Sequence, residues 1–479
     1  MKRHDLVIIG GGTGGLVSAP IAAALGARVA LIERDRTGGD CLWTGCVPSK
    51  TLIATAAVVQ AMRTADELGL TAVRPSIDFT AVMRRVRDVI ATIEPEASVE
   101  RLRDAGVEVI TADGRFTAPH RILAGGRELC WRTAIIATGS EPVVPGLDGL
   151  GDADPLTTET VWGLEELPRR LLVLGGGPIG CELAQAFARL GAHVTVVELA
   201  PRLLLKEEPR ASDFLRDRLE QEGITVRLGA RPRCVTRIPG GFRLEFDDHD
   251  QEPVTFDRML VATGRRPRTA GLGLETVGVA VDDRGAVNVD THLRSTAKSI
   301  YAVGDVTGAY PFTHVAAHHA RVATPNALFH ARSKVASVVP WVTFTDPELA
   351  HVGLTREQAR ERWGDRVQIA ESDYIHLDRA ITAGRAHGFA LLIGDPNGQL
   401  VGATVCAPAA GEAIAELTAW ITQKGRIHDV SRTLHAYPTF AEGPARAADD
   451  FLSARLLAGR ASKVSPHILS ILRWLDRTR

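Results

Sequence analysis

The chain has 479 residues, too many for one hydrophobic core, and its length points to about three domains. Hydrophobic residues make up 45% and charged residues 24%, and the net charge of −1 predicts no attraction to nucleic acid or to an anionic membrane. The six cysteines are scattered except for Cys41 and Cys46, which excludes a secreted disulfide scaffold and favours a redox enzyme of the cytoplasm.

The N-terminal segment has the pattern of a strand, a glycine turn, a helix and a second strand. The apolar run 5–9 precedes the glycine-rich turn 10–15, an Ala/Leu-rich helix to Gly26 follows, and the strand 28–32 ends at Glu33. In such a βαβ unit a dinucleotide pyrophosphate lies on the helix N-terminus and the acidic residue binds the ribose. Because the glycines and Asp5 interrupt the apolar stretch, a signal peptide is excluded. We also find no uninterrupted apolar run of about 18 residues, so no membrane partner is expected.

The same unit occurs a second time. A strand 170–174 leads into the turn 175–180, a helix to Leu190 and a strand 193–197 that ends at Glu198. Glu33 and Glu198 each lie 18 residues beyond the last glycine of their turn. Two complete units disfavour a turn made only for packing and predict two dinucleotides. A carboxylate at Glu198 would repel the 2′-phosphate of NADP, so NADH is favoured over NADPH, although Arg202 offsets this in part.

The remaining elements are less distinctive. We expect an amphipathic helical stretch over 79–103, and two strands that end in similar Ala-Thr-Gly sequences at Gly139 and Gly264. Another buried strand closes on Gly304 and Asp305. From Pro340, strands and helices alternate to about residue 450. The tail 468–479 has apolar residues at helical spacing, which favours a docking helix over a membrane anchor.

The segment 38–52, GGDCLWTGCVPSKTL, contains the two clustered cysteines. In a regular helix, residues five apart are separated by about 7.5 Å along the axis, whereas a disulfide needs Cα atoms within about 7 Å. The backbone between Cys41 and Cys46 must therefore bend, and Gly45 and Pro48 allow this at a helix start. A helix N-terminus also lowers a thiol pKa. The alternative is a pair of inert buried cysteines, which is the better interpretation for the four isolated ones: Cys130, Cys181, Cys234 and Cys406.

This segment resembles the redox-active disulfide of the pyridine nucleotide–disulfide oxidoreductases, which include dihydrolipoamide dehydrogenase, glutathione reductase and mercuric reductase. The resemblance runs from residue 1 to about 450 in the family's order, and includes TAIIATG (133–139), AVGD (302–305) and FTDPELAHVGLT (344–355). It implies an α/β homodimer with two Rossmann-like dinucleotide-binding domains and a C-terminal α+β dimerisation domain. The implied divisions are an FAD domain at 1–145 and 265–335, an NAD(P) domain at 146–264, a dimerisation domain at 336–450 and a helical tail at 451–479.

The resemblance also implies roles for individual residues. Cys46 would lie against the flavin as the charge-transfer thiol, Cys41 would attack the substrate, and Lys50 would lie near the flavin N5 and pair with Glu182. Asp305 would hold the FAD ribityl chain. The alternative for Lys50 and Glu182 is that they are ordinary exposed charges. No metal site is expected. The expected cofactor contacts are, for FAD, Gly10, Gly12, Thr13, Gly14, Gly15, Glu33, Gly39, Lys50, Thr138, Gly139, Gly304 and Asp305, and, for the nicotinamide, Gly175, Gly177, Ile179, Gly180, Glu198 and Gly264.

The C-terminal motif departs from that of the dithiol-handling members. They have a histidine before a proline and a glutamate five residues later, and the partner subunit uses this pair as acid and base. Here Tyr437 precedes the proline, whereas Glu442 is in place. A phenol titrates near pKa 10 and an imidazole near 6.5, so Tyr437 is a poor base. His435 lies two residues away and is an alternative base.

We therefore expect an FAD-dependent enzyme that passes electrons from NAD(P)H through FAD to Cys41 and Cys46, and on to a disulfide, a metal ion or another acceptor. A mercuric or other metal-ion reductase is one alternative: mercuric reductases carry a tyrosine at position 437, but also a C-terminal cysteine pair, whereas this chain has no cysteine after Cys406. A dihydrolipoamide dehydrogenase is a second alternative, which Tyr437 disfavours. A binding protein without turnover is disfavoured by the cysteine pair.

Overall fold

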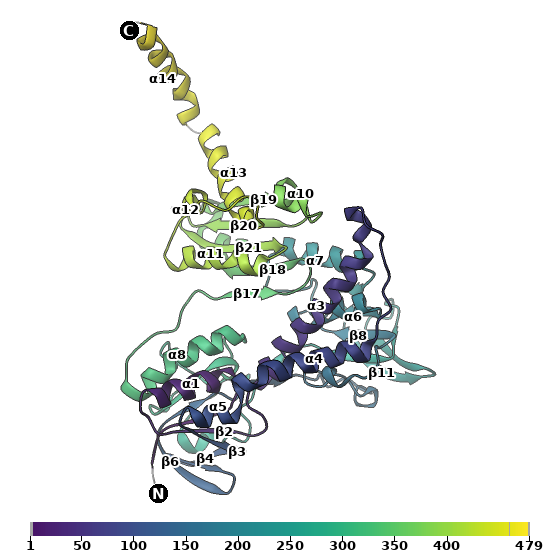
Figure 1. Ribbon diagram of the computed structural model, residues 1–479, viewed down its shortest axis with the longest axis vertical. Coiled ribbons are helices and arrows are strands. Elements are labelled where there is room, and N and C mark those ends of the chain that lie inside the picture. The colour runs from purple at the N-terminus through teal and green to yellow at the C-terminus, as the bar shows by residue number, and fades with distance from the viewer. Residues whose placement is uncertain (1–2, 459, 478–479) are drawn as a thin grey trace. The chain divides into compact units, whose positions relative to one another are not determined.

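The computed structural model describes residues 3–458 and 460–477, and the chain divides into two compact units (Figure 1). Unit 1 contains the residues up to Thr64, Ala72–Leu203 and Arg218–Ser337. Unit 2 contains Ala65–Thr71, Leu204–Asp217 and the residues from Val338 onward.

The first sheet of unit 1 has seven strands in the order β3-β2-β1-β6-β5-β4, with β16 paired to β6. The strands around β1 are parallel, whereas β4, β5 and β6 form an antiparallel meander. Helices cover one face of the parallel part, the meander contributes to the other, and apolar residues on both faces form its two core clusters. The strands are β1 His4–Ile9, β2 Val29–Glu33, β3 Val107–Thr111, β4 Gly114–Ala118, β5 Arg121–Ala124, β6 Arg127–Ile136 and β16 Ile300–Ala302.

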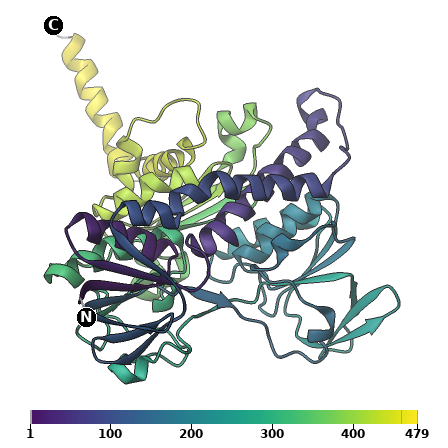
Figure 2. The same cartoon turned by 60° about the horizontal axis from the view of Figure 1, so that its bottom comes forward.

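The second sheet of unit 1 is parallel, with the order β10-β9-β8-β14, and a three-stranded antiparallel sheet accompanies it. The ribbon β7–β15 joins the two nucleotide-type sheets, because β7 follows the first sheet in the chain and β15 follows the second (Figure 2). The strands are β7 Ser140–Pro142, β8 Arg170–Leu174, β9 His193–Val197, β10 Thr225–Arg227, β11 Pro232–Ile238, β12 Gly241–Phe246, β13 Val254–Phe256, β14 Arg258–Val261 and β15 Arg265–Pro267.

The helices of unit 1 lie against these sheets and against one another. Helix α1 packs on α8, and α3 packs on both α4 and α6. Figure 2 shows α3 and α4, in dark purple and blue, running side by side. The helices are α1 Thr13–Ala24, α2 Gly39–Trp43, α3 Cys46–Arg63, α4 Phe79–Ile93, α5 Val99–Asp104, α6 Pro178–Leu190 and α8 Thr313–Phe329.

The two predicted βαβ units are confirmed almost to the residue, since each strand is an apolar run that a glycine or a charge ends. The helical stretch expected over 79–103 is helical except at Ser98, but it consists of two α-helices joined by a 3₁₀ turn. Helix α4 ends at Ile93, a short 3₁₀ turn contains Pro95, and α5 begins after Ser98, whose hydroxyl accepts a hydrogen bond from the Arg101 N–H. Proline cannot continue the ladder of helical hydrogen bonds, and the serine caps a new helix.

Unit 2 is built on a five-stranded antiparallel sheet in the order β17-β18-β21-β20-β19. Helix α11 packs on β18 and β21, and α13 packs on β19 and β20. These sheets and helices confirm the predicted α/β class. The elements are β17 Pro340–Thr343, β18 Glu348–Gly353, β19 Gln368–Asp373, β20 Phe389–Gly394, β21 Leu400–Ala407, α7 Pro209–Gln221 (assigned to unit 2 up to Asp217), α9 Arg356–Trp363, α10 Asp378–Thr382, α11 Ala410–Thr422, α12 Ile427–Arg432, α13 Glu442–Ala458 and α14 Arg460–Arg477.

The C-terminal helix α14 lies within the predicted tail 451–479, whose start falls inside α13, and several large apolar side chains of α14 are exposed, among them Ile468, Ile471 and Leu472. One described stretch, Gly39–Arg63, is long and apolar enough to cross a membrane by composition alone. That stretch contains α3, which packs on α4 and α6.

Candidate active site

The first glycine turn, between β1 and α1, leaves no room for a side chain at Gly10 or Gly15. A Cβ on Gly10 would lie 2.3 Å from the Ala137 carbonyl oxygen, and one on Gly15 would lie 2.0 Å from the Gly10 carbonyl oxygen. Glu33, at the end of β2, accepts a 2.6 Å hydrogen bond from the Gly11 N–H and a 2.9 Å bond from the Asp35 N–H. The free helix N-terminus beside a fixed carboxylate fits the pyrophosphate and ribose of a dinucleotide.

The second turn repeats this geometry between β8 and α6. A Cβ on Gly175 would lie 2.4 Å from the Ala262 carbonyl oxygen, and one on Gly180 would lie 2.0 Å from the Gly175 carbonyl oxygen. Glu198 accepts hydrogen bonds of 2.6 Å from the Gly176 N–H and 2.7 Å from the Ala200 N–H. Gly177 differs, because a Cβ there would meet no protein atom within 4 Å. That open space lies where a nucleotide backbone would approach.

The backbone bends between the two cysteines, as predicted. Cys41 lies in α2, which ends at Trp43, and Cys46 is the first residue of α3. Gly45 accommodates the bend, since a Cβ there would lie 2.9 Å from the Asp40 carbonyl oxygen. Both cysteines are free thiols in this structure. The two thiols interact with each other. Because Cys46 is the first residue of α3, it lies at a helix N-terminus, a position that stabilises a thiolate.

The surroundings divide the two thiols into a proton donor and a thiolate. A hydrogen bond from Cys41 lowers the pKa of Cys46 to about 6, burial opposes the shift, and the Thr313 hydroxyl and Lys50 assist it. The Thr313 Oγ1 lies 3.3 Å from the Cys46 sulfur. The same hydrogen bond, together with burial, raises the pKa of Cys41. At neutral pH the reduced pair therefore has its negative charge on Cys46 and its proton on Cys41.

Lys50 lies one turn further along α3 and forms an ion pair with Glu182 of α6. The Lys50 Nζ is 2.7 Å from the Glu182 Oε2, and only 7% of the glutamate side chain is exposed, against 37% of the lysine. A carboxylate this deeply buried requires a cationic partner. The pair links the helix of the cysteines to the helix that follows the second glycine turn.

The other predicted cofactor-contact residues all lie in unit 1. Asp305 is half-buried and accepts a 2.7 Å hydrogen bond from the Ser140 hydroxyl, and desolvation raises its pKa. A Cβ on Gly39 would lie 2.6 Å from the Cα of Gly12, so the redox segment touches the glycine turn. Thr13 is the first residue of α1, and a Cβ on Gly14 would meet Val303. The Thr138 hydroxyl donates a hydrogen bond to the Arg268 carbonyl, and Ile179 is partly exposed. The backbone has positive φ at Gly139, Gly264 and Gly304.

Two family models match the chain. The model described as pyridine nucleotide-disulphide oxidoreductase covers residues 4–320, and that of the family's dimerisation domain covers residues 339–448. The chain belongs to the pyridine nucleotide–disulphide oxidoreductase family. It is accordingly an FAD-dependent oxidoreductase, and its dimerisation domain supports a homodimer.

Relatives of this oxidoreductase cover nearly its whole length. A mercuric reductase of Streptomyces lividans is 38% identical over 94% of this chain and 96% of its own. A dihydrolipoyl dehydrogenase of Thermus scotoductus is 36% identical over 94% of this chain and 97% of its own. Among solved structures, the Cu(II) complex of the HOCl-induced flavoprotein disulfide reductase RclA from Escherichia coli has a TM-score of 0.84 and 29% identity, and it covers 95% of this chain and 100% of its own.

In the dimerisation domain of this oxidoreductase, the structure gives Tyr437 an unexpected partner. Its hydroxyl donates a 2.8 Å hydrogen bond to the Asp378 carboxylate of α10, and the side chain is 71% exposed. The hydrogen bond to Asp378 raises the pKa of Tyr437. Tyr437 is therefore an even poorer base here than a free phenol.

The other two candidates of this motif are engaged elsewhere. The His435 ring lies 2.8 Å from both the Glu416 carboxylate and the Thr433 carbonyl oxygen. Glu442 accepts a 2.8 Å hydrogen bond from the Thr439 N–H at the start of α13. The structure thus brings neither His435 nor Glu442 into a hydrogen bond with Tyr437.

The sequence did not point to Thr313 or Asp378. Each reaches its partner across a long stretch of chain, 267 residues from Cys46 to Thr313 and 59 from Asp378 to Tyr437. For Thr313 the sequence offered one indication, its position at the start of a helix soon after Gly304-Asp305; Asp378 had no such indication. Within the described residues, no group of three or more His, Cys, Asp or Glu side chains is arranged to hold a metal ion.

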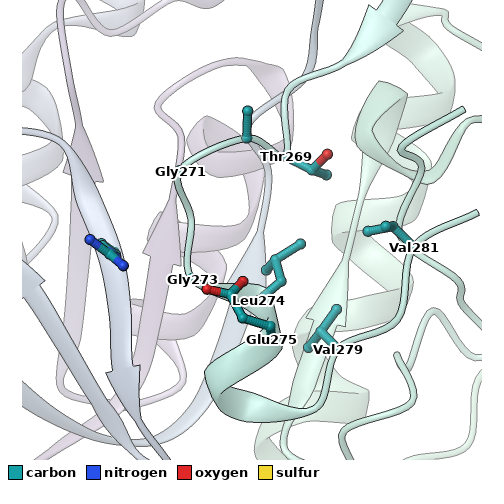
Figure 3. A pocket seen from close by; sticks show the side chains of 9 residues that line it. Thr269, Gly271, Gly273, Leu274, Glu275, Val279 and Val281 are labelled. Atoms are coloured by element: carbon teal, nitrogen blue, oxygen red, sulfur yellow. The ribbon is translucent and has the colours of Figure 1, made fainter.

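A shallow pocket elsewhere in unit 1 does not share these residues. Figure 3 shows it beside the 3₁₀ turn Leu274–Val277, with Thr269, Glu275 and Val281 among its lining residues. None of the predicted site residues lines it. Its lining contains no thiol and neither glycine-rich turn, so we assign no cofactor to it.

Proposed function

We propose that this oxidoreductase takes electrons from NADH in preference to NADPH and delivers them through Cys46 and Cys41 to an acceptor that needs no histidine base. The thiol pair carries the proposal: Cys46 is held as a thiolate at a helix start, beside the protonated Cys41. When bound, FAD supplies the two-electron relay between the nicotinamide and the thiols. A cytoplasmic location is part of the proposal, and the scattered cysteines support it.

The chain's own residues would hold the cofactors and the proton. The turn 10–15 with Glu33 would bind FAD, and Asp305 would contact its ribityl chain. The turn 175–180 with Glu198 would bind NADH, because the carboxylate accepts ribose hydroxyl donors and repels a 2′-phosphate. Lys50 would lie near the flavin ring. Reduction of the Cys41–Cys46 disulfide breaks the S–S bond and leaves a proton on Cys41 and a charge on Cys46; reoxidation by the acceptor restores the bond.

A soft metal ion is the acceptor that the thiol pair suits best. Thiolates bind soft metal ions, and reduction of Cu(II) or Hg(II) consumes electrons without a proton from the motif around Tyr437. Two relatives support this candidate through their names, one as a mercuric reductase and one as a Cu(II) complex. The stoichiometry would be one NADH for two Cu(II) reduced to Cu(I), or for one Hg(II) reduced to the metal.

A dihydrolipoyl dehydrogenase activity is the second candidate, since the relative from Thermus scotoductus has that name. It needs proton transfer at the interchange thiol, for which Tyr437, bonded to Asp378, is poorly suited.

The test is NADH oxidation by the purified protein against lipoamide, glutathione disulfide, Cu(II), Hg(II) and a quinone, with the Cys41→Ser variant as control. We expect turnover with the metal ions that Cys41→Ser abolishes. Brisk lipoamide turnover with no response to either metal ion would instead establish the second candidate, and metal-ion turnover that survives Cys41→Ser would exclude the thiols from the pathway.

A further inference from the structure

Arg265 lies at the point where the chain crosses between the two nucleotide-type sheets of unit 1. It is the first residue of β15, which pairs antiparallel with β7, and its side chain is only 18% exposed. Strand β7 follows the first sheet in the chain and β15 follows the second. A guanidinium buried at this crossing can contact both halves of unit 1.

The guanidinium bonds residues from three segments besides its own strand. The Nε donates to the Ser140 hydroxyl at 2.8 Å, and the Nη1 donates to the Thr158 hydroxyl at 3.1 Å. The Nη2 donates to the Ser140 carbonyl at 2.9 Å and to the Asp40 carboxylate. Only a planar fork with several fixed donors can satisfy partners in these directions at once, so a lysine would not replace it.

The contact with Asp40 reaches the redox segment, because Asp40 is the residue before Cys41 in α2. Asp40 also receives a 3.3 Å hydrogen bond from the Thr44 hydroxyl, which spans the bend between the cysteines. A second contact with the segment 40–44 comes from Trp162, four residues after Thr158. Its indole N–H donates to the Thr44 carbonyl at 2.9 Å and to the Thr158 carbonyl at 2.8 Å. Trp162 thus holds the Thr44 end of the segment 40–44, and Arg265, which also bonds Thr158, holds the Asp40 end.

The network extends from Ser140 to Asp305. Ser140 accepts from Arg265 and donates to the Asp305 carboxylate, so one chain of bonds joins Asp40, Arg265, Ser140 and Asp305. The charges of Arg265 and Asp40 act on Asp305 in opposite directions, the arginine lowering its pKa and the aspartate raising it, while burial dominates. Removal of either partner alone would leave an uncompensated charge in this partly buried network.

We propose that Arg265 is a positioning residue that ties the redox segment 40–44 to the strands joining the two nucleotide-binding sheets. The segment carrying Cys41 and the nicotinamide-binding half of unit 1 then move as one body. A change in the second sheet on nucleotide binding is thereby transmitted to the bend between the cysteines. This inference rests on the proposed function in one respect, that Cys41 and Cys46 are the thiols that carry the electrons.

The test measures hydrogen exchange of the backbone amides at 39–46 and the alkylation rate of the reduced thiols, both in the holoenzyme. Arg265→Gln is expected to accelerate local exchange and alkylation about tenfold, the effect of losing a hydrogen bond to a charged group. Asp40→Asn should give a similar effect at 39–46, and the double variant should be no faster than Arg265→Gln alone, since that variant already removes the contact with Asp40.

Arg266→Gln is the matched control, since Arg266 is the next residue on β15, pairs with Glu141 and is 67% exposed. In Arg266→Gln the backbone amides at 39–46 should exchange hydrogen at the rate of the native protein. In the native protein and in this control, NAD⁺ should slow exchange at 39–46; in Arg265→Gln that protection should be lost although NAD⁺ still binds. A merely structural role would accelerate exchange throughout unit 1 and leave the protection by NAD⁺ intact.

Arg265→Lys keeps the positive charge and provides a second variant in case Arg265→Gln does not fold. It should show accelerated exchange at 39–46, because one ammonium cannot reach all four partners. Native exchange in both Arg265→Lys and Asp40→Asn, or additive effects in the double variant, would overturn the inference. These rates need no turnover, so a failure of NADH-dependent metal-ion reduction would count against the proposed function alone.

Discussion

At the residue scale, the hydroxyl of Thr313 supports the Cys46 thiolate in addition to the hydrogen bond from Cys41, since its oxygen is 3.3 Å from the sulfur. The pKa of Cys46 is lowered to about 6, so the reduced protein holds the thiolate above that pH and loses it as the pH falls through about 6. Thr313→Val removes one hydrogen bond to a charged group and should raise the midpoint by about one unit.

The midpoint can be followed by the ultraviolet absorption of the thiolate in the reduced protein as the pH is varied. Thr324→Val is the control, because Thr324 lies on the same helix and its hydroxyl bonds the Ala320 carbonyl instead. An unchanged midpoint in Thr313→Val would mean that Cys41 and Lys50 alone hold the thiolate.

Glu198 is the second residue whose role can be isolated. Its two carboxylate oxygens already bond the Gly176 and Ala200 N–H groups, so the carboxylate is fixed where a ribose would lie. Glu198→Arg replaces a charge that repels a 2′-phosphate with one that attracts it. The ratio of NADH to NADPH reduction rates should fall by about tenfold, equivalent to about 1.4 kcal/mol. Stopped-flow flavin reduction measures the ratio, and equal rates with both cofactors in the native protein would contradict the proposed preference.

At the element scale, the turn between β8 and α6 distinguishes two kinds of glycine. A methyl on Gly180 would lie 2.0 Å from the Gly175 carbonyl oxygen, so Gly180→Ala must move the strand or the helix. Gly177 has φ −75° and open space in the direction of its missing Cβ. Gly180→Ala should lower the melting temperature and abolish NADH binding, whereas Gly177→Ala should keep the native melting temperature and weaken NADH binding alone. Thermal unfolding and equilibrium NADH titration separate these effects. A lowered melting temperature of Gly177→Ala would show that the protein itself fills the space beside Gly177.

Elements defined by local pattern could be predicted from the sequence, and those defined by a contact across the chain could not. Strands β1, β8 and β9 are apolar runs with glycine or acidic ends, so their bounds followed from sequence. The helical stretch over 79–103 could be predicted from its amphipathic pattern, but its division into two α-helices at Pro95 and Ser98 was not predicted. The bend at Gly45 followed from the spacing of the cysteines. By contrast, Asp40 has no local feature that points to Arg265, 225 residues away, because only the β7–β15 crossing brings them together.

At the scale of the whole molecule, a homodimer gives the Tyr437 motif its importance, since the resemblance implies that this motif faces Cys41 of the other subunit. Tyr437→His replaces a phenol with a group that titrates near neutral pH. Asp378, which already bonds the hydroxyl at this position, is the carboxylate available to orient the ring. A positioned base contributes about 10²–10⁴-fold, so lipoamide turnover should rise at least about tenfold.

Steady-state rates with lipoamide, for the native protein and the variants, measure this gain. Asp378→Asn in the Tyr437→His background should cancel most of it, whereas Glu442→Gln, whose carboxylate bonds the Thr439 N–H, should matter less. Tyr437→Phe, made in the native background, is the control and should leave the weak native rate unchanged. Brisk native turnover that survives Tyr437→Phe would place the base elsewhere, with His435 the next candidate.

The unequal acidity of the two thiols sets how many protons accompany the electrons. Above about pH 6 the reduced pair retains one proton, on Cys41, so closing or opening the disulfide exchanges two electrons and a single proton. A hydride contains that same number of each. NADH can therefore reduce the disulfide without taking a proton from water. The equilibrium between NADH and the two thiols should not change with pH over this range. Below about pH 6 a second proton enters, and each further unit should shift the equilibrium toward the thiols by up to tenfold. Redox titrations against the NAD⁺/NADH ratio at several pH values would reveal the change in slope.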